Sequence, residues 1–242
     1  MLWYLEKRHH YYWFWRRLKM DSEKKVILKV LVGSKAHGLA DKDSDSDFRA
    51  VYVLPTKDIL SLNYKYKGND WIEGDEDNTA YEIGHFLHLA LKCNPTILEV
   101  FKAPIVESTE DGLVLRELFD YVWNPQDSFN AFVGYGLNQR KKMLDKKDNR
   151  PNKYAVAYTR TLVNLIDLLK TGTFDLKVSF LEEEMRRFRA GQFMNGEVID
   201  LTEKLTIMAK DKLDQCKHAP NEEKVNEFLI NIRKKYFNLT HP

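Results

Sequence analysis

Two short motifs at a fixed spacing carry the chemistry of this sequence. The apolar run 26–32 leads into Gly33-Ser34, and ten residues separate Ser34 from Asp45, which is followed two places on by Asp47. Side chains two apart on a β-strand point to the same face, about 6.6 Å from each other along the strand. We therefore expect Asp45 and Asp47 to present two carboxylates side by side, close to a glycine turn.

This pair of motifs suits metal-dependent chemistry on a nucleotide. Mg²⁺ prefers oxygen ligands and is commonly shared between one or two carboxylates and substrate phosphates. In a two-metal site, ions about 3.5–4 Å apart clamp the attacking and leaving oxygens of an in-line displacement. Glycine lets the backbone approach a phosphate, and turn N–H groups and a serine hydroxyl can donate to its oxygens. The pattern predicts that Gly33 and Ser34 hold a nucleoside triphosphate, while Asp45 and Asp47 hold Mg²⁺ or Mn²⁺.

The same acidic stretch has other interpretations. An EF-hand calcium loop needs Gly at its sixth and Glu at its twelfth place, but counting from Asp43 these places hold Phe48 and Leu54. The P-loop pattern Gly-x-x-x-x-Gly-Lys-Ser/Thr does not occur. A solvated acidic turn stays open as the competing interpretation.

The quoted residues resemble a known family. Segments Gly33–Ala40 and Asp43–Arg49 are similar to the signature of the DNA polymerase beta-like nucleotidyltransferase superfamily, most closely its RNA-repair-associated branch. Segment Phe86–Glu99, an apolar helix that ends in Asn-Pro and is followed by Glu99, also resembles that branch. Residues 26–105 carry the resemblance well and the rest only loosely. It implies an α/β (α+β) nucleotidyltransferase fold, with a small mixed sheet followed by a helical C-terminal region.

Two positions depart from the pattern. Ser46 stands where the superfamily usually has an apolar residue, and His37 stands where the branch often has tyrosine. Neither change removes a metal ligand.

Strands and helices must position these motifs. Val26–Val32 and Asp47–Leu54 have the β-branched and aliphatic composition of strands, and Pro55 stops the second. Asn94 followed by Pro95 predicts an N-cap and first helical residue. We further expect a turn or helix start at 34–39, an exposed loop at 65–75, and helices at 57–62, 83–90, 96–101 and 112–121.

A third carboxylate completes such a site, on a strand beside the first two. The segment 77–82 is the natural candidate, with Asp77 preferred and Glu82 second. These two residues point to opposite faces of a strand, so only one can share the metal. The chosen residue would bind the metal to which the attacking hydroxyl coordinates. Glu99 has no evident structural requirement, and the resemblance leaves it as a weak substrate-side candidate.

Basic residues gather after residue 139. A solvated face is the usual explanation of such a run, although a polyanionic substrate also needs a basic wall. The run consists of Arg140, Lys141, Lys142, Lys146, Lys147, Arg150 and Lys153.

A long helix at 152–170 carries two cations of interest. Its apolar stripe includes Tyr158 and Leu162, whereas Lys153, Arg160 and Asn164 lie opposite it, and Gly172 is the C-cap. We hypothesise that Lys153 and Arg160, exposed on one line, bind the triphosphate across a cleft. An ordinary solvent-facing role is the alternative.

Composition sets the wider limits. The chain has 242 residues and a net charge of +2, so nucleic-acid binding would have to come from local patches. Its two cysteines match no zinc or redox spacing, and neither a membrane span nor a secretory signal is evident, which favours a cytoplasmic protein. No motif defines an oligomeric state. We divide the chain into an aromatic and basic arm or extension (1–20), a catalytic domain (21–125) and a helical domain (126–242).

The predicted reaction transfers a nucleoside monophosphate from a triphosphate to an acceptor hydroxyl and releases pyrophosphate. By resemblance the acceptor is an RNA end, in RNA repair or modification. One alternative keeps the chemistry with a protein or small-molecule acceptor. Another is a non-catalytic, antitoxin-like protein that binds nucleotide or RNA.

Overall fold

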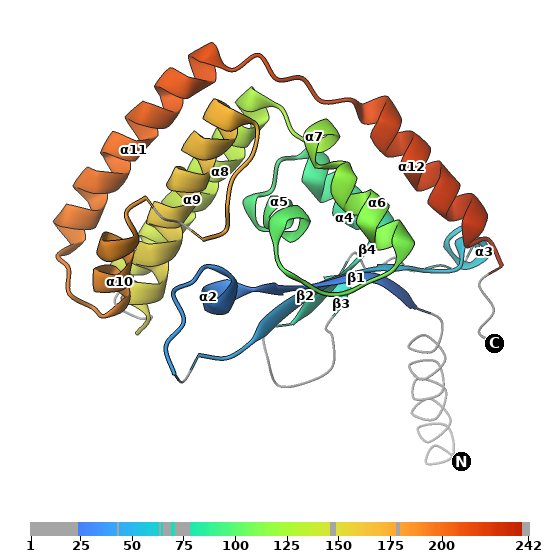
Figure 1. The fold of residues 1–242 in the computed structure, drawn as a ribbon, viewed down its shortest axis with the longest axis horizontal. Coiled ribbons are helices and arrows are strands. Elements are labelled where there is room, and N and C mark those ends of the chain that lie inside the picture. Colours follow the sequence, from blue (N-terminus) through green and yellow to red (C-terminus); the bar gives the residue numbers. More distant parts are fainter. Residues whose placement is uncertain are drawn as a thin grey trace, which may run out of the picture.

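The computed structural model describes residues 24–42, 44–62, 64, 69–70, 78–145, 149–177 and 180–238. Within these ranges the strands form one sheet in the order β3-β4-β2-β1-β5 (Figure 1). β1 pairs antiparallel with β2 and β5, and β4 pairs parallel with β2 and antiparallel with β3. The sheet is therefore small and mixed, and a helical region follows it, which confirms the predicted fold class.

Strands and helices mix up to residue 108, and helices are the only regular elements among the described residues beyond it. The strands are β1 (Lys25–Val32), β2 (Asp47–Val53), β3 (Asn69–Asp70), β4 (Thr79–Glu82) and β5 (Ile105–Ser108). The early helices are α2 (Gly33–Ala36), α3 (Thr56–Ile59), α4 (Ile83–Leu91) and α5 (Pro95–Lys102). The later ones are α6 (Glu110–Glu117), α7 (Phe119–Val122), α8 (Pro125–Leu144), α9 (Pro151–Thr171), α10 (Glu182–Arg189), α11 (Asn195–Gln215) and α12 (Glu222–Lys235).

The main helices cover one face of the sheet (Figure 1). On β2, Val51 and Val53 belong to the large core under these helices, whereas Ala50 and Tyr52 belong to a smaller apolar cluster on the other face. Alternation along the strand therefore turns Asp47 and Arg49 toward the helical layer. The same layer holds α5, whose backbone Arg49 contacts.

Helix α9 is buried on more sides than its sequence predicted. It packs against α8, α10 and α11, and Gly172 with φ 79° forms the expected C-cap. The predicted exposure of Arg160 and Asn164 is wrong, because their exposed fractions are only 7% and 1%. Neighbouring helices cover the face that a single amphipathic stripe would have left to solvent.

Other parts of the local prediction were incomplete. The helix expected at 112–121 is two helices, α6 and α7, with Leu118 between them. The helix expected at 57–62 is the single turn α3. β5 was not predicted, since its four residues are mostly exposed and lack a clear alternation. Of the loop expected at 65–75, only β3 lies within the described residues.

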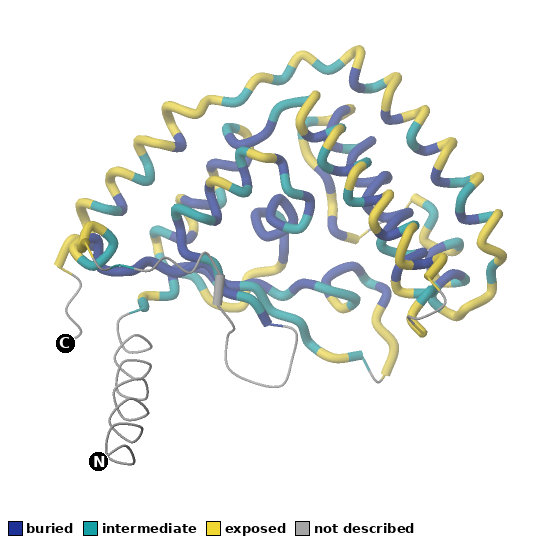
Figure 2. The backbone as a smooth tube through the Cα atoms, turned by 180° about the vertical axis from the view of Figure 1, so that it is seen from behind, coloured by how far each residue is buried: buried dark blue, intermediate teal, exposed yellow. Residues whose placement is uncertain are grey.

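The C-terminal helix closes back onto the sheet. α11 and α12 form an arch over the other helices, and much of their length is exposed (Figures 1 and 2). At the end of the arch, the backbone N–H of Thr56 donates to the carbonyl of Tyr236 at 3.0 Å. The last described helix thus stabilises the edge where α3 lies.

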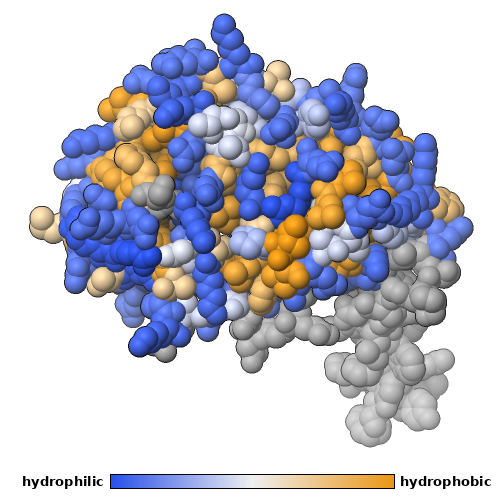
Figure 3. All heavy atoms as spheres, in the orientation of Figure 1, coloured by the Kyte–Doolittle hydropathy of each residue, from blue (hydrophilic) through white to orange (hydrophobic). Residues whose placement is uncertain are grey.

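The visible surface is mostly hydrophilic, with hydrophobic residues in separate patches (Figure 3). Both cysteines, Cys93 and Cys216, are unpaired thiols. None of the helices in the described ranges combines the length and the apolar character that crossing a membrane requires.

Candidate active site

Gly33 and Asp47 lie directly against each other. In the register of β1 and β2, Val32 pairs with Asp47, and the chain then turns at Gly33 with φ +70°. A Cβ atom on Gly33 would overlap Oδ2 of Asp47 and lie 3.0 Å from its Cγ. Both the left-handed backbone and the close carboxylate require glycine here. The structure thus brings together the glycine turn and one of the two predicted acids.

The turn is fixed to the residues that precede β2. The ammonium group of Lys35 donates to the hydroxyl of Ser46 at 2.7 Å, and the N–H of Leu39 donates to the carbonyl of Ser34 at 2.9 Å. Asp45, one residue before Ser46, is exposed, whereas Asp47 is half-buried. One carboxylate therefore stands at the open rim and the other beneath the turn.

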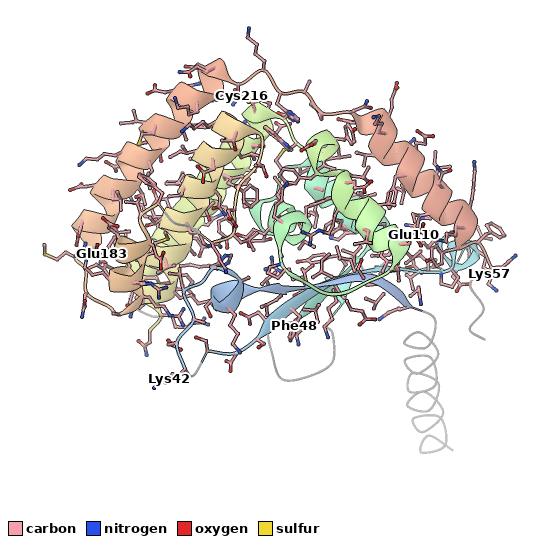
Figure 4. The ribbon with its side chains drawn as sticks, in the orientation of Figure 1. Lys42, Phe48, Lys57, Glu110, Glu183 and Cys216 are labelled. Carbon is pink, nitrogen blue, oxygen red and sulfur yellow. The ribbon has the colours of Figure 1, made fainter. Side chains whose placement is uncertain are left out.

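Helix α10 anchors the loop that joins the two motifs. Arg186 donates to the carbonyl of Gly38 at 2.8 Å, and Arg189 pairs with Asp41 at 3.0 Å and donates to Ser44 at 2.8 Å. In Figure 4, Lys42 marks the tip of this loop and Glu183 lies on α10. Sequence reasoning missed this anchor because the bonded residues are as much as 148 positions apart.

Glu82 is too far from the two acids to be the third carboxylate. Along the parallel pair of β2 and β4, Arg49 lies beside Thr79 and Tyr52 lies beside Glu82. Tyr52 is five residues from Asp47, or about 16 Å along the strand. The fully buried carboxylate of Glu82 instead accepts from the N–H of Gly84 at 2.7 Å and pairs with Arg233 at 2.6 Å. The alternative that used Glu82 is therefore wrong.

Asp77, the preferred third carboxylate, lies outside the described residues. Its neighbour Asn78 is 4% exposed and accepts from the N–H of Phe48 at 2.9 Å, so β4 begins beside the start of β2. Figure 4 labels Phe48 on β2. Among the residues that the structure describes, His, Cys, Asp and Glu form no group of three that could hold a metal ion.

A buried polar cluster lies between α2, α5 and α9. Glu99 of α5 pairs with Arg160 of α9, and both side chains are 8% exposed. Nε2 of His37 lies 4.0 Å from Oε2 of Glu99, while Nδ1 of His37 contacts the carbonyl of Leu176 at 3.3 Å. Since a carbonyl only accepts, Nδ1 carries the imidazole proton. Glu99 therefore has the structural partner that the sequence did not reveal.

Burial and charge set the protonation of this cluster. Burial and then the nearby Arg160 lower the pKa of His37 to about 4, so the imidazole is neutral at pH 7. Burial by itself raises the pKa of Glu99, but the charge and hydrogen bond of Arg160, together with His37 and Arg49, outweigh burial and hold the pKa below its usual value. Burial raises the pKa of Tyr135 on α8, and the charges of Arg160 and Glu99 also act on this residue.

The two predicted cations of α9 differ in environment. Lys153 is exposed in the first turn, whereas Arg160 lies about 10.5 Å further along the axis and is buried in its pair with Glu99. Part of the basic run makes contacts within the protein: Arg140 pairs with Glu203 at 3.3 Å, and Arg150 donates to the Tyr154 hydroxyl at 3.3 Å. Lys146 and Lys147 lie outside the described residues.

Sequence reasoning also gave no role to Arg49, which lies two residues after Asp47. Its guanidinium donates to the carbonyl of Thr96 at 2.7 Å, under the helical layer. The strand alternation that grouped Asp45 with Asp47 could have found it, because the next residue on the same face is Arg49.

Fold and site together define a protein of the nucleotidyltransferase type: a small mixed sheet, a glycine turn after its first strand and an aspartate of the next strand against that turn. The chain belongs to the RNA repair pathway DNA polymerase beta family, whose model matches residues 7–232. This membership confirms the resemblance found in the sequence and supports a nucleotidyltransferase-type function.

Two curated proteins show a similar sequence. An uncharacterized 38.9 kDa protein of Enterobacteria phage T4, from the nrdC-mobD intergenic region, is 30% identical over 155 residues, covering 60% of this chain and 43% of its own length. The uncharacterized protein YcgL of Bacillus subtilis strain 168 is 27% identical over 145 residues, covering 57% of this chain and 55% of its own. The chain spans about half the length of these relatives.

Proposed function

We propose that the protein is a metal-dependent nucleotidyltransferase that moves a nucleoside monophosphate from a nucleoside triphosphate to the hydroxyl of an RNA end. The observation that carries this proposal is the contact between the Asp47 carboxylate and Gly33, at a distance that leaves no room for a side chain on the turn. Membership of a polymerase beta family of the RNA repair pathway supports both the chemistry and the acceptor.

The residues present fit Mg²⁺ or Mn²⁺. Asp47, the first residue of β2, and Asp45, two residues before it, would supply hard oxygen ligands, and Mg²⁺ commonly needs only one or two carboxylates besides phosphates and waters. Asp77 is the proposed third carboxylate, next to the described Asn78. When bound, the ions would neutralise charge on the phosphates and on the attacking and leaving oxygens.

The chain's own groups would orient the substrate. The backbone N–H groups of the turn at Gly33 and the hydroxyl of Ser34 would donate to phosphate oxygens. The acceptor oxygen forms a bond to the α-phosphorus, the bond from that phosphorus to the bridging oxygen breaks, and pyrophosphate leaves while the hydroxyl proton passes to solvent. We propose that the exposed Lys153 binds the phosphates of the nucleotide. Arg160 could bind the same phosphates only if its guanidinium were shared between them and Glu99.

A labelling experiment tests the proposal. The protein is incubated with each α-labelled nucleoside triphosphate and Mg²⁺ or Mn²⁺, in the presence of RNA, protein or no acceptor. We expect label on RNA and release of pyrophosphate. The variant Asp45→Ala with Asp47→Ala should abolish transfer, and activity that persists in it would show that the site lies elsewhere.

The other results separate the alternatives. Label on protein supports a protein acceptor with the same chemistry. If neither RNA nor protein becomes labelled but the triphosphate binds, the result supports a non-catalytic nucleotide-binding protein. Either result contradicts the RNA acceptor.

A further inference from the structure

The charges of the buried polar cluster are balanced within it, and Arg49 of β2 lies close enough to influence them. Arg160 is paired with Glu99, and His37 is neutral. Arg49 is the remaining cation of the group, since its charge influences both His37 and Glu99. Its guanidinium donates to the carbonyl of Thr96, and none of the described carboxylates pairs with it.

A backbone carbonyl satisfies one donor of Arg49 but not its charge. The guanidinium has five N–H donors, and a half-buried cation that no carboxylate contacts directly is stabilised when an anion reaches it. Arg116 on α6 provides a comparison: it too donates to a backbone carbonyl, that of Ala103, at 2.5 Å. The two arginines differ in place, because only Arg49 shares a strand face with Asp47.

The position of Arg49 points to the anion. Asp47 and Arg49 lie on the same face of β2, about 6.6 Å apart along the strand, and Asp45 lies two residues before the strand begins. The N-terminal turn of α5, which contains Thr96, orients the guanidinium under the helical layer. An arginine fork matches the oxygens of a phosphate and can bind two of them at once.

We propose that Arg49 binds the phosphates of the nucleoside triphosphate that Asp45 and Asp47 hold through metal ions. This inference rests on the proposed function and assigns the nucleotide-recognising cation to β2. Arg160 is then a positioning residue: its charge is balanced by Glu99, and it fixes α5 against α9.

Binding measurements with a matched control test this assignment. Wild type, Arg49→Gln and Arg116→Gln are titrated with a nucleoside triphosphate, with tripolyphosphate and with the uncharged nucleoside, each with Mg²⁺. The thermal unfolding midpoint of each ligand-free protein is measured in parallel. A third variant, Arg49→Lys, keeps the charge but lacks the fork.

We expect Arg49→Gln to weaken binding of the triphosphate and of tripolyphosphate by about tenfold or more, the usual effect of losing hydrogen bonds to a charged group. Nucleoside binding should not change. Arg49→Lys should lie between wild type and Arg49→Gln. Arg116→Gln should bind like wild type, and its unfolding midpoint should fall at least as far as that of Arg49→Gln.

Each contrary result has one meaning. If Arg49→Gln binds tripolyphosphate as well as wild type, the inference is wrong and the proposed function stands. If Arg49→Gln does not fold, Arg49 has a structural role and the inference is equally wrong. If wild type binds no triphosphate with Mg²⁺ or Mn²⁺, the proposed function fails and the inference fails with it.

Discussion

Two regions of the molecule balance their charges in opposite ways. One is the acidic rim, which consists of Gly33, Asp45 and Asp47, and the other is the buried cluster of His37, Glu99 and Arg160. Asp45 is exposed, with no ionic partner among the described residues, and lies near a second carboxylate. Glu99 is buried with an arginine against it and a neutral histidine beside it. An exposed carboxylate such as that of Asp45 is available to a metal ion, whereas the buried carboxylate of Glu99, paired with its own cation, stabilises the fold.

The two regions also differ in how the chain builds them. The rim joins residues 33 and 47 across two paired strands. The cluster joins residues 37, 99 and 160 from three helical segments. Substitutions in the rim should therefore affect activity and spare stability, and substitutions in the cluster should first affect stability.

The largest expected effect on activity comes from Asp45→Asn. The change removes one charge and keeps the shape, so we expect nucleotidyl transfer to fall to background because a metal ligand is lost. The free energy of unfolding should stay within about 0.5 kcal/mol of wild type, as for other exposed sites. Denaturant unfolding and the labelling assay check both parts. A large loss of stability with intact transfer would reverse the comparison.

The largest expected effect on stability comes from Glu99→Leu. It leaves Arg160 buried without its partner, which typically costs about 3–5 kcal/mol of unfolding free energy. The double variant Glu99→Leu with Arg160→Leu should recover much of this loss, because two apolar side chains of similar size can replace a buried pair. Chemical denaturation of both variants provides the measurement. Equal stability of the single and double variants would show that the pair is not coupled.

The sequence revealed the rim because its signals are local. The spacing from Gly33 to Asp47 and the alternation of β2 depend only on neighbouring residues, and Asn94 likewise caps α5 as predicted, with its side chain accepting from Thr96 at 3.0 Å. The cluster was missed because a single sequence does not show which helices meet. The sequence predicted that Arg160 is exposed on α9, whereas in the structure Glu99 of α5 pairs with it.

β5 and Glu82 show the same limit. β5 is a short edge strand whose partner, β1, lies about 80 residues earlier, and it has little apolar pattern of its own. Glu82 was a reasonable metal ligand by sequence order, but the strand register places it at the far end of β2 from Asp47. Pairing between distant segments determines both the formation of β5 and the position of Glu82, and local composition does not predict such pairing.

His37 offers a smaller and more selective test, because it links the rim to the cluster. Its pKa is lowered to about 4 by burial and by Arg160, whereas the imidazole of the unfolded chain keeps the ordinary value of 6.5. Between these two pH values the unfolded state binds a proton that the folded state does not. The stability that neutral His37 allows is therefore fully present above pH 6.5 and falls as the pH drops toward 4, by at most about 3 kcal/mol.

The variant His37→Gln removes this titration. Its stability should fall less than that of wild type between about pH 7 and about pH 4.5, because the variant lacks an imidazole that gains a proton on unfolding in this range. Urea unfolding of both proteins at several pH values measures the difference, and taking that difference subtracts the titration of the groups that both proteins share. Parallel pH profiles would mean that His37 is accessible to protons in the folded state. Since the imidazole lies on the turn that carries Gly33 and contacts Glu99, such a result would also show that water enters between the rim and the cluster.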